Sequence, residues 1–564
     1  MSNLEIAELL RNISACYQLK DPIKYKFQII AYDRAATAVE HSTSELKDLW
    51  DDGKLDDVPG IGPSIASHLD EVFKKGKSKH FEELMKGIPK EAFKLMELPK
   101  IGIKTAIKFI DEKNKSEIND LLKMVDISRK NKRHLLPYAQ MIASEVTEWI
   151  LKCSEVERVD SLGSLRRMAA TVGDIDISVA SKNSSKVIDQ FVKFPKVQEI
   201  IEKGDHTASI LIPGNIQVDL MVIKPSSYGS LLQHFTGSKF HNIALREYAQ
   251  TLGFSLSEYG VKKVSSKDNK ILEFETEEKL YNLLKLDYIE PELRENMGEL
   301  EASESHSLPK LMELKDIKGD LQIHSNFDIE TSHDLGLSSM EDIAIKAIKL
   351  NYEYIAFTEH SPSKSNHTEK EVVEILKRKR ENVDQLNYSF NNNCNNRVFK
   401  VFNSLEIDIN KDGSLPISDE GLETLDFALV SVHSSFDLSK DEMTKRVLNS
   451  LDYPRIKILA HPTARKINDR EGIELDWPKI FEFCIKNNKF LEINADPARL
   501  DLPDSLVREA VKYGVKMTLG TDSHDVSMLD NMTYGVSVAR RGWCEIKNIV
   551  NCLSLEKFKE VIKL

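Results

Sequence analysis

The C-terminal third repeats one pattern that restricts its fold more than any other feature of the chain. Short apolar runs end in a histidine or an acid, as in YEYIAFTEH, FALVSVH and IKILAHP. Helical segments separate these runs, and such alternation is typical of a parallel sheet or barrel. In a βα barrel the carboxyl ends of the strands meet at one mouth. The sequence therefore predicts that these strand ends converge, and the residues they carry are His360, Glu406, His433, His461, Asp522 and His524.

One histidine after a strand is more often a core or rim residue, but five strand ends in series argue for a metal-binding site. A set rich in imidazole and carboxylate suits zinc, manganese or iron, with metals close enough to share a hydroxide that attacks a phosphodiester. The first strand of the series, KGDLQIHSNFD, is the least regular. Its Gln322 and His324 project from one face at a two-residue period. His324 is a candidate ligand, whereas an amide is a weaker ligand than an imidazole.

A second region carries acids in a different pattern. In GSLRRMAATVGDIDISV, Asp174 and Asp176 alternate with isoleucines, so both carboxylates share one face of a predicted strand. Asp219 lies in IQVDLMVI, a strand of the same type. Adjacent like charges repel, and a divalent cation is the usual relief. Three carboxylates on a sheet can hold two Mg²⁺ ions for nucleotidyl transfer.

The residues before this strand suit a phosphate. Gly163 and Ser164 form a tight turn with donor groups, and Arg167 adds a charge-assisted donor. A lone DxD is commonly a solvated turn. The order GS, RR, GDxD and a later strand aspartate is more specific and favours catalysis.

Two loops near the N-terminus share the frame apolar-Pro-x-Ile-Gly followed by a helix, VPGIGPSIASHL and LPKIGIKTAIKF. Glycine turns at helix N-termini present backbone N–H groups that suit a DNA phosphate without reading bases. The alternative is an ordinary turn between two helices. We expect DNA contacts at Gly60, Gly62, Gly102 and Lys104, and Lys100 makes the second loop the weaker match.

Length and charge limit the class of protein. The 564 residues exceed one core and indicate three or four domains. No apolar run approaches the length of a membrane span and the start lacks a secretory signal, so we expect a cytoplasmic protein. The six cysteines are scattered, which argues against a disulfide framework. We also expect a monomer. The net charge of −12 hides a segment from Lys100 to Arg133 with ten Lys and Arg against five Asp and Glu. Nucleic-acid binding is therefore expected of segments only.

On these motifs, residues 1–295 resemble a family X DNA polymerase. The resemblance implies that Asp174, Asp176 and Asp219 bind the catalytic metals and that Ser164, Arg167 and Gly173 contact the incoming triphosphate. HFTGSKFHNIALR resembles the family's thumb segment. It implies a sugar pocket of His234, Phe235 and Gly237, with Asn242 and Arg246 near the nascent pair. His234 stands where vertebrate members place tyrosine, which leaves ribose discrimination open.

The same resemblance predicts a loss of sugar-phosphate lyase activity. His68 occupies the place of the family's Schiff-base lysine, and Ser64 replaces a lysine of the 5′-phosphate pocket. An imidazole does not replace an amine nucleophile. The activity would persist only if Lys74, Lys75 or Lys77 stands in.

Residues 318–564 resemble the PHP (polymerase and histidinol phosphatase) superfamily. The resemblance implies a distorted seven-stranded barrel with up to three metals, often manganese, that supports 3′-5′ exonuclease activity. Arg465 in HPTAR is placed to meet a phosphate. Gln322 departs from the usual His-x-His, and the acid expected at Ile329 is displaced to Asp328 or Glu330. We take Asp328 as the ligand.

The predicted fold is a multidomain α+β and α/β chain: an N-terminal helical domain with the first helix-hairpin-helix (1–80), a fingers domain with the second (81–137), a nucleotidyltransferase palm (138–224), a thumb (225–295), a linker (296–317) and a (β/α)7 PHP barrel (318–564). The expected function is gap-filling DNA synthesis in base excision repair, with an appended exonuclease. Expected partners are gapped or primed DNA and deoxynucleoside triphosphates, with Mg²⁺ in the palm and Mn²⁺ or Zn²⁺ in the barrel.

Two alternatives remain open. GS with DxD also marks nucleotidyltransferases that act on RNA ends. The second alternative is a DNA-binding scaffold whose barrel is inactive, and Gln322 keeps this interpretation open.

Overall fold

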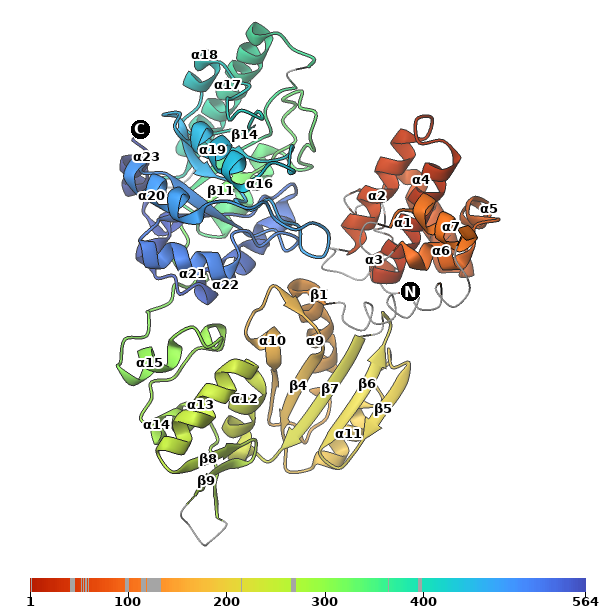
Figure 1. Ribbon diagram of the computed structural model, residues 1–564, viewed down its shortest axis with the longest axis vertical. Coiled ribbons are helices and arrows are strands. Elements are labelled where there is room, and N and C mark those ends of the chain that lie inside the picture. Colours follow the sequence, from red (N-terminus) through yellow and green to blue (C-terminus); the bar gives the residue numbers. More distant parts are fainter. Residues whose placement is uncertain are drawn as a thin grey trace. The chain divides into compact units, whose positions relative to one another are not determined.

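The computed structural model describes residues 1–563 except 2, 41–45, 52, 54, 56, 57, 59, 97–100, 113–117, 119–132, 215, 265–269, 364 and 394–397. Lys100 and most of the basic segment lie outside the described residues. The chain forms two compact units (Figure 1). The first holds residues 1–167, 171–238 and 245–284, and the second holds 168–170, 239–244 and 285–564.

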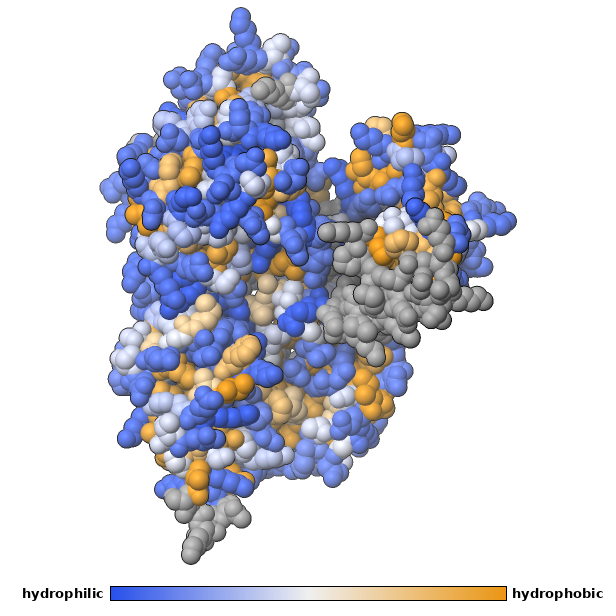
Figure 2. Space-filling view, viewed as in Figure 1, coloured by the Kyte–Doolittle hydropathy of each residue, from blue (hydrophilic) through white to orange (hydrophobic). Residues whose placement is uncertain are grey.

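The first unit begins with short helices. They are α1 (Asn3–Lys20), α2 (Lys26–Glu40), α3 (Leu46–Asp51), α4 (Pro63–Lys75), α5 (Lys79–Met85), α6 (Lys90–Leu95) and α7 (Ile103–Glu112). Ile6, Leu10 and Ile13 of α1 are fully buried, as a three-and-four spacing predicts. Other apolar side chains stay outside, and Figure 2 shows hydrophobic surface over these helices. Ile23 and Phe27 are 88% and 83% exposed.

A mixed five-stranded sheet follows in the order β2-β4-β7-β6-β5. Its strands are β2 (Arg158–Ser161), β4 (Ile175–Ala180), β5 (Glu199–Lys203), β6 (Thr207–Ile212) and β7 (Ile216–Ile223). Only the β4–β7 pair is parallel. Helices α9 (Leu136–Ile150) and α11 (Ser184–Phe191) pack against β4 and β7. The short strands β1 (His134–Leu135) and β3 (Thr171–Val172) pair separately. This sheet lies within residues 138–224, the predicted palm.

Beyond the palm, α12 (Tyr228–Thr236) and α13 (Lys239–Thr251) precede an antiparallel sheet of β8 (Phe254–Ser257), β9 (Gly260–Lys263) and β10 (Ile271–Leu272). Helix α14 (Glu277–Leu283) packs on α12. The approach is so close that a Cβ on Gly229 of α12 would lie 2.2 Å from the Thr276 carbonyl carbon. Glycine is therefore required at this crossing.

The second unit is a parallel barrel. One sheet holds β11 (Gly319–Ile323), β12 (Tyr354–Phe357) and β13 (Lys400–Asn403); the other holds β14 (Glu406–Asp408), β15 (Ala428–Ser431), β16 (Ile456–Leu459), β17 (Phe490–Asn494) and β18 (Met517–Gly520). All neighbouring pairs are parallel. Ile323 bridges to Ser523, which closes β11 onto β18. Only two residues separate β13 from β14, and the described residues of this unit form eight strands in two sheets where the resemblance implied seven strands.

Helix α15 (Glu299–Glu304) precedes the first barrel strand. The helices that pack around the barrel are α16 (Met340–Lys349), α17 (Glu369–Asn393), α18 (Asp419–Glu423), α19 (Lys440–Leu451), α20 (Trp477–Asn487), α21 (Asp504–Tyr513), α22 (Met532–Arg541) and α23 (Leu555–Ile562). The strands are buried on both faces, as a covered parallel sheet requires. In the part of the chain that the structure describes, no helix is long and apolar enough to span a membrane.

Candidate active sites

The palm brings two of the three predicted carboxylates directly together. Asp176 of β4 and Asp219 of β7 are register partners across parallel strands, so their side chains share one face. Asp174 directly precedes β4 and is exposed. Gly163 makes room for the site, because a Cβ there would lie 2.9 Å from Asp176 Oδ2. This finding gives a physical reason for the glycine of the GS motif.

The electrostatics of this face suit a cation. Burial, together with the charges of Asp219 and Asp174, raises the pKa of Asp176 to about 7. Both carboxylate oxygens of Asp219 accept a hydrogen bond from Gln217 Nε2 at 3.0 Å. Carboxylates crowded with so little neutralisation are a donor set that suits Mg²⁺.

The predicted phosphate residues lie next to this face. Gly163 and Ser164 open α10 (Gly163–Arg166). Arg167 was expected to contact the triphosphate, and its Nη1 donates to the Thr236 carbonyl at 2.5 Å. Arg166 Nη2 meets Glu277 at 2.6 Å. The arginines thus tie the palm turn to the end of α12, and Gly173 directly precedes Asp174.

The predicted sugar pocket lies at that end of α12. His234 and Phe235 belong to the last turn, and Gly237 follows with φ +69°. Helix α13 carries Asn242 and Arg246, and Arg246 Nη2 lies 3.3 Å from His234 Nδ1. Burial lowers the pKa of His234. A neutral imidazole therefore faces the arginine at neutral pH.

The N-terminal loops have the helix starts that the sequence predicted. Gly60 has φ +85°, and Gly62 directly precedes α4 with Pro63 at its first position. Gly102 precedes α7, which carries Lys104. His68 on α4 stacks on His80 with centroids 4.4 Å apart. The lysines considered as its substitutes pair with acids, namely Lys74 with Asp70, Lys75 with Glu71 and Lys77 with Glu82.

In the barrel the predicted residues converge around Glu406, which is the first residue of β14 and not the end of a strand as predicted. Its Oε1 lies 2.9 Å from His461 Nε2 and 3.5 Å from His433 Nε2. Its Oε2 lies 3.3 Å from His324 Nε2 and 3.8 Å from His360 Nδ1. Four groups of three residues have ligand atoms within 4.8 Å of one another: His324, His360, His524; His333, His360, His433; Glu406, His433, His461; and His324, Glu406, Asp522.

These groups have the charge balance of a metal centre. Burial would lower the pKa of His324, but Asp522 and Glu406 raise it to about 10. Without a metal an imidazolium thus supplies the positive charge that the two acids need. Buried ring nitrogens of His324, His360 and His461 have no hydrogen-bond partner among the described residues. His461 and Asp522 also adopt φ of 27° and 53°, a strain typical of functional positions.

The loop after His324 corrects one prediction. Asp328 was expected to be a ligand, but it belongs to none of the four groups among the described residues, and its Oδ1 accepts from the Glu330 N–H at 3.1 Å. Ile329 is fully buried in the core. Glu330 pairs with His367 and Arg378. A shift of the loop by one residue, which would bring Asp328 or Glu330 to the position expected at Ile329, therefore does not describe its path.

That path delivers residues that sequence reasoning missed. His333 joins His360 and His433, and the charge of Asp334 acts on His524. Asp408 lies 2.5 Å from both His333 and His433. Only Asp408 had a signal in the sequence, since it follows Glu406 by two residues and shares its strand face.

Arg465 also differs from its prediction. Instead of facing a phosphate, its Nε and Nη2 donate to the carbonyl oxygens of Arg499 and Leu500. Arg499 takes the position at the cluster. Its Nε lies 3.7 Å from Asp522 and 3.9 Å from Asp496, and its buried Nη1 has no hydrogen-bond partner among the described residues.

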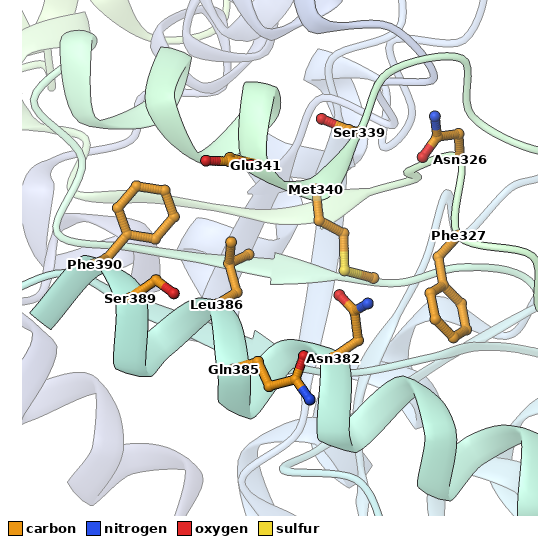
Figure 3. Close-up of a pocket in the computed structure, with 10 residues that line it drawn as sticks. All are labelled: Asn326, Phe327, Ser339, Met340, Glu341, Asn382, Gln385, Leu386, Ser389 and Phe390. Atoms are coloured by element: carbon orange, nitrogen blue, oxygen red, sulfur yellow. The ribbon is translucent and has the colours of Figure 1, made fainter.

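A groove of about 550 Å³ lies elsewhere on the barrel, between α16 and α17 (Figure 3). Asn326, Phe327, Met340 and Asn382 are among its lining residues. No residue that lines it belongs to the four groups of the described chain. The groove is therefore separate from the metal cluster.

Comparisons with known proteins agree with this arrangement. A helix-hairpin-helix domain model matches residues 1–78, and a DNA polymerase beta thumb model matches residues 231–295. The DNA polymerase/3′-5′ exonuclease PolX of Bacillus subtilis is 32% identical over 591 aligned positions that cover 100% of both chains. DNA polymerase lambda of Rattus norvegicus is 22% identical over 52% of this chain and 56% of its own. With similarity of this degree over its full length, the chain belongs to the PolX family of DNA polymerases.

Proposed function

We propose that the chain is a gap-filling DNA polymerase of the repair type that also trims DNA 3′ ends in its barrel. The observation that carries the first activity is the face shared by Asp176 and Asp219 beside the Gly163 turn. Full-length similarity to a polymerase with exonuclease activity supports the pairing of the two activities in one chain.

In the palm, Asp174, Asp176 and Asp219 would hold Mg²⁺, which lowers the pKa of the primer hydroxyl and neutralises the leaving group. The 3′-oxygen attacks the α-phosphorus of a deoxynucleoside triphosphate, and pyrophosphate leaves. Asp219, whose two carboxylate oxygens both accept a hydrogen bond from Gln217, would orient that hydroxyl and take up its proton. Ser164 and Arg167 would bind the triphosphate from the adjoining turn, and Arg167 also holds the start of the sugar pocket through Thr236.

In the barrel, Glu406 and the six predicted residues around it would hold Mn²⁺ or Zn²⁺, which would supply an activated water molecule as the nucleophile. Water adds to the phosphorus of the terminal phosphodiester, the P–O3′ bond breaks, and a nucleoside 5′-monophosphate leaves. The shortened strand keeps the proton on its new 3′-hydroxyl. The Arg499 guanidinium, rather than that of Arg465, would bind a non-bridging phosphate oxygen through its unpartnered Nη1.

One experiment tests the polymerase site. Purified protein is given DNA with a one-nucleotide gap, Mg²⁺ and deoxynucleotides, and extension should disappear in Asp174→Ala. A matched run with a primed RNA template or a free RNA end tests the alternative substrate. Extension that persists in Asp174→Ala contradicts the assignment, and activity confined to RNA ends contradicts gap filling.

A second experiment tests the barrel. Manganese-dependent degradation of single-stranded DNA should survive Asp174→Ala and vanish in His433→Ala. Wild-type protein without any nuclease signal would favour the scaffold interpretation for the barrel.

A further inference from the structure

The segment after His324 brings a histidine into the cluster that neither the strand pattern nor the family resemblance predicted. His333 Nε2 lies 2.5 Å from Asp408 Oδ2. The His333 ring stacks on His360 with centroids 4.7 Å apart and lies 5.3 Å from the ring of His433. These three imidazoles form one of the four groups with ligand atoms within 4.8 Å.

The backbone on both sides of His333 is fixed in place. On one side Thr331 bridges to Pro362. On the other, Gly336 packs so tightly that a Cβ would lie 2.2 Å from the His324 carbonyl oxygen. The Leu337 N–H then donates to the His524 carbonyl at 2.6 Å. The segment is thus attached to two strand ends that carry ligands, and His333 does not depend on a freely moving loop.

Asp408 orients two of the three rings. One of its oxygens lies 2.5 Å from His433 Nδ1 and the other 2.5 Å from His333 Nε2. A carboxylate in this position fixes the ring and the tautomer of a metal-binding histidine and makes the opposite nitrogen a stronger ligand. The opposite nitrogens are Nε2 of His433, which already faces Glu406 at 3.5 Å, and Nδ1 of His333.

Gln322 takes the place of a histidine on the inner side of the cluster, next to the buried group of His324, Glu406 and Asp522. Its Nε2 donates to Glu406 Oε2 at 2.8 Å, where an imidazole at this position would offer a lone pair to a cation. The residue is fully buried. The inner group of His324, Glu406 and Asp522 therefore has one strong ligand fewer, while the group of His333, His360 and His433 has three imidazoles.

We propose that His333 is a metal ligand, oriented by Asp408. It adds an imidazole to the group of His333, His360 and His433, and this compensates for the imidazole that the group of His324, Glu406 and Asp522 lacks because residue 322 is a glutamine. The inference rests on the proposed metal centre of the barrel and names the residues of one of its positions. Three imidazoles favour a borderline cation such as Zn²⁺ over Mg²⁺.

The test measures bound metal rather than activity. Protein stripped with chelator is reloaded with Zn²⁺, desalted and analysed for zinc per chain, and a parallel sample is titrated with Co²⁺ and followed by visible absorption. His333→Ala should hold one equivalent less and lose part of the Co²⁺ absorption. Asp408→Asn keeps the imidazoles and should bind the affected ion about 10–100-fold more weakly.

His367→Ala is the matched control, because His367 lies in a neighbouring loop and pairs with Glu330 at 2.9 Å, outside the four groups. Its zinc content should equal that of the wild type. Gln322→His in the His333→Ala background should restore the lost equivalent. Circular dichroism and melting curves check that each variant is folded.

The outcomes separate this inference from the proposal on which it rests. Wild-type protein that binds no metal would contradict the barrel metal centre itself. A wild type that binds metal, with an unchanged content in folded His333→Ala, would overturn the role of His333. Loss in His333→Ala without recovery in the double variant would overturn the exchange with Gln322.

Discussion

The palm and the barrel both gather acids on parallel strands, but they balance the charge of those acids differently. In the palm, carboxylates meet on a partly open face, and burial together with the charges of Asp219 and Asp174 raises the pKa of Asp176 to about 7. In the barrel, buried histidines surround Glu406, and without a metal Asp522 and Glu406 raise the pKa of His324 to about 10. We therefore expect the palm to take up its cations with the substrate and the barrel to retain its own.

The largest expected effect is the loss of one activity without the other. Glu406→Gln removes the carboxylate that belongs to two of the four groups, so the barrel should lose most of its bound metal and its exonuclease activity. Primer extension should remain near the wild-type rate. Asp219→Asn should do the reverse, with extension reduced at least about 1,000-fold and barrel metal unchanged. Metal analysis and the two assays on the same preparations decide, and a variant that lost both activities while folded would contradict the separation.

Arg499 gives the next largest effect. Arg499→Met should raise the KM for single-stranded DNA about 10–100-fold, because hydrogen bonds to charged groups contribute about 1.5–3 kcal/mol. Bound zinc should stay at the wild-type level, since Arg499 is no ligand. Arg499→Lys should recover only part of the loss, because an ammonium lacks the planar fork of a guanidinium.

Arg378→Gln is the control, an arginine of the same unit that pairs with Glu330 away from the cluster. It should leave the KM unchanged. A wild-type KM in Arg499→Met would mean that Arg499 only neutralises Asp522 and Asp496.

The charge of the palm predicts a pH effect on stability. A carboxyl whose pKa rises from 3.8 to about 7 on folding binds its proton more tightly in the folded state, so its contribution is present below pH 3.8 and is lost as the pH rises through 7. Asp176→Asn removes this penalty. In chelator, its free energy of unfolding should exceed that of the wild type at pH 8 by up to about 4 kcal/mol.

The difference should shrink toward pH 4, and urea denaturation at both pH values measures it. Added Mg²⁺ should stabilise the wild type more than the variant at pH 8. An equal difference at both pH values would show that the carboxyl is not the cause.

Gln322→His alone should give the smallest change. It adds an imidazole to the inner group of His324, Glu406 and Asp522, so metal should bind somewhat more tightly there, by less than about tenfold. Competition with a chelating dye measures the gain. A variant with no gain in metal affinity or exonuclease rate would count against a weakened inner position.

The sequence by itself determined which residues end the strands and which face they share. A two-residue period needs no knowledge of distant contacts, so Asp174 and Asp176, and the series from His360 to His524, could be identified from local pattern alone. The same period places Asp408 on the strand face of Glu406, but this residue was missed because the sequence predicts that the strand ends at Glu406. The likeness to family X followed from these motifs in their order.

Only the tertiary structure decided the positions that depend on the path of a loop. Asp328 lies outside the cluster and His333 inside it because Gly336 and Leu337 pack against the strand ends of His324 and His524, contacts that no local pattern encodes. Arg465 and Arg499 are equally plausible in sequence, and the hydrogen bonds of Arg465 to the backbone of residues 499 and 500 leave Arg499 at the cluster. Local periodicity sets the face of a strand, whereas long-range packing sets the route of the chain between strands.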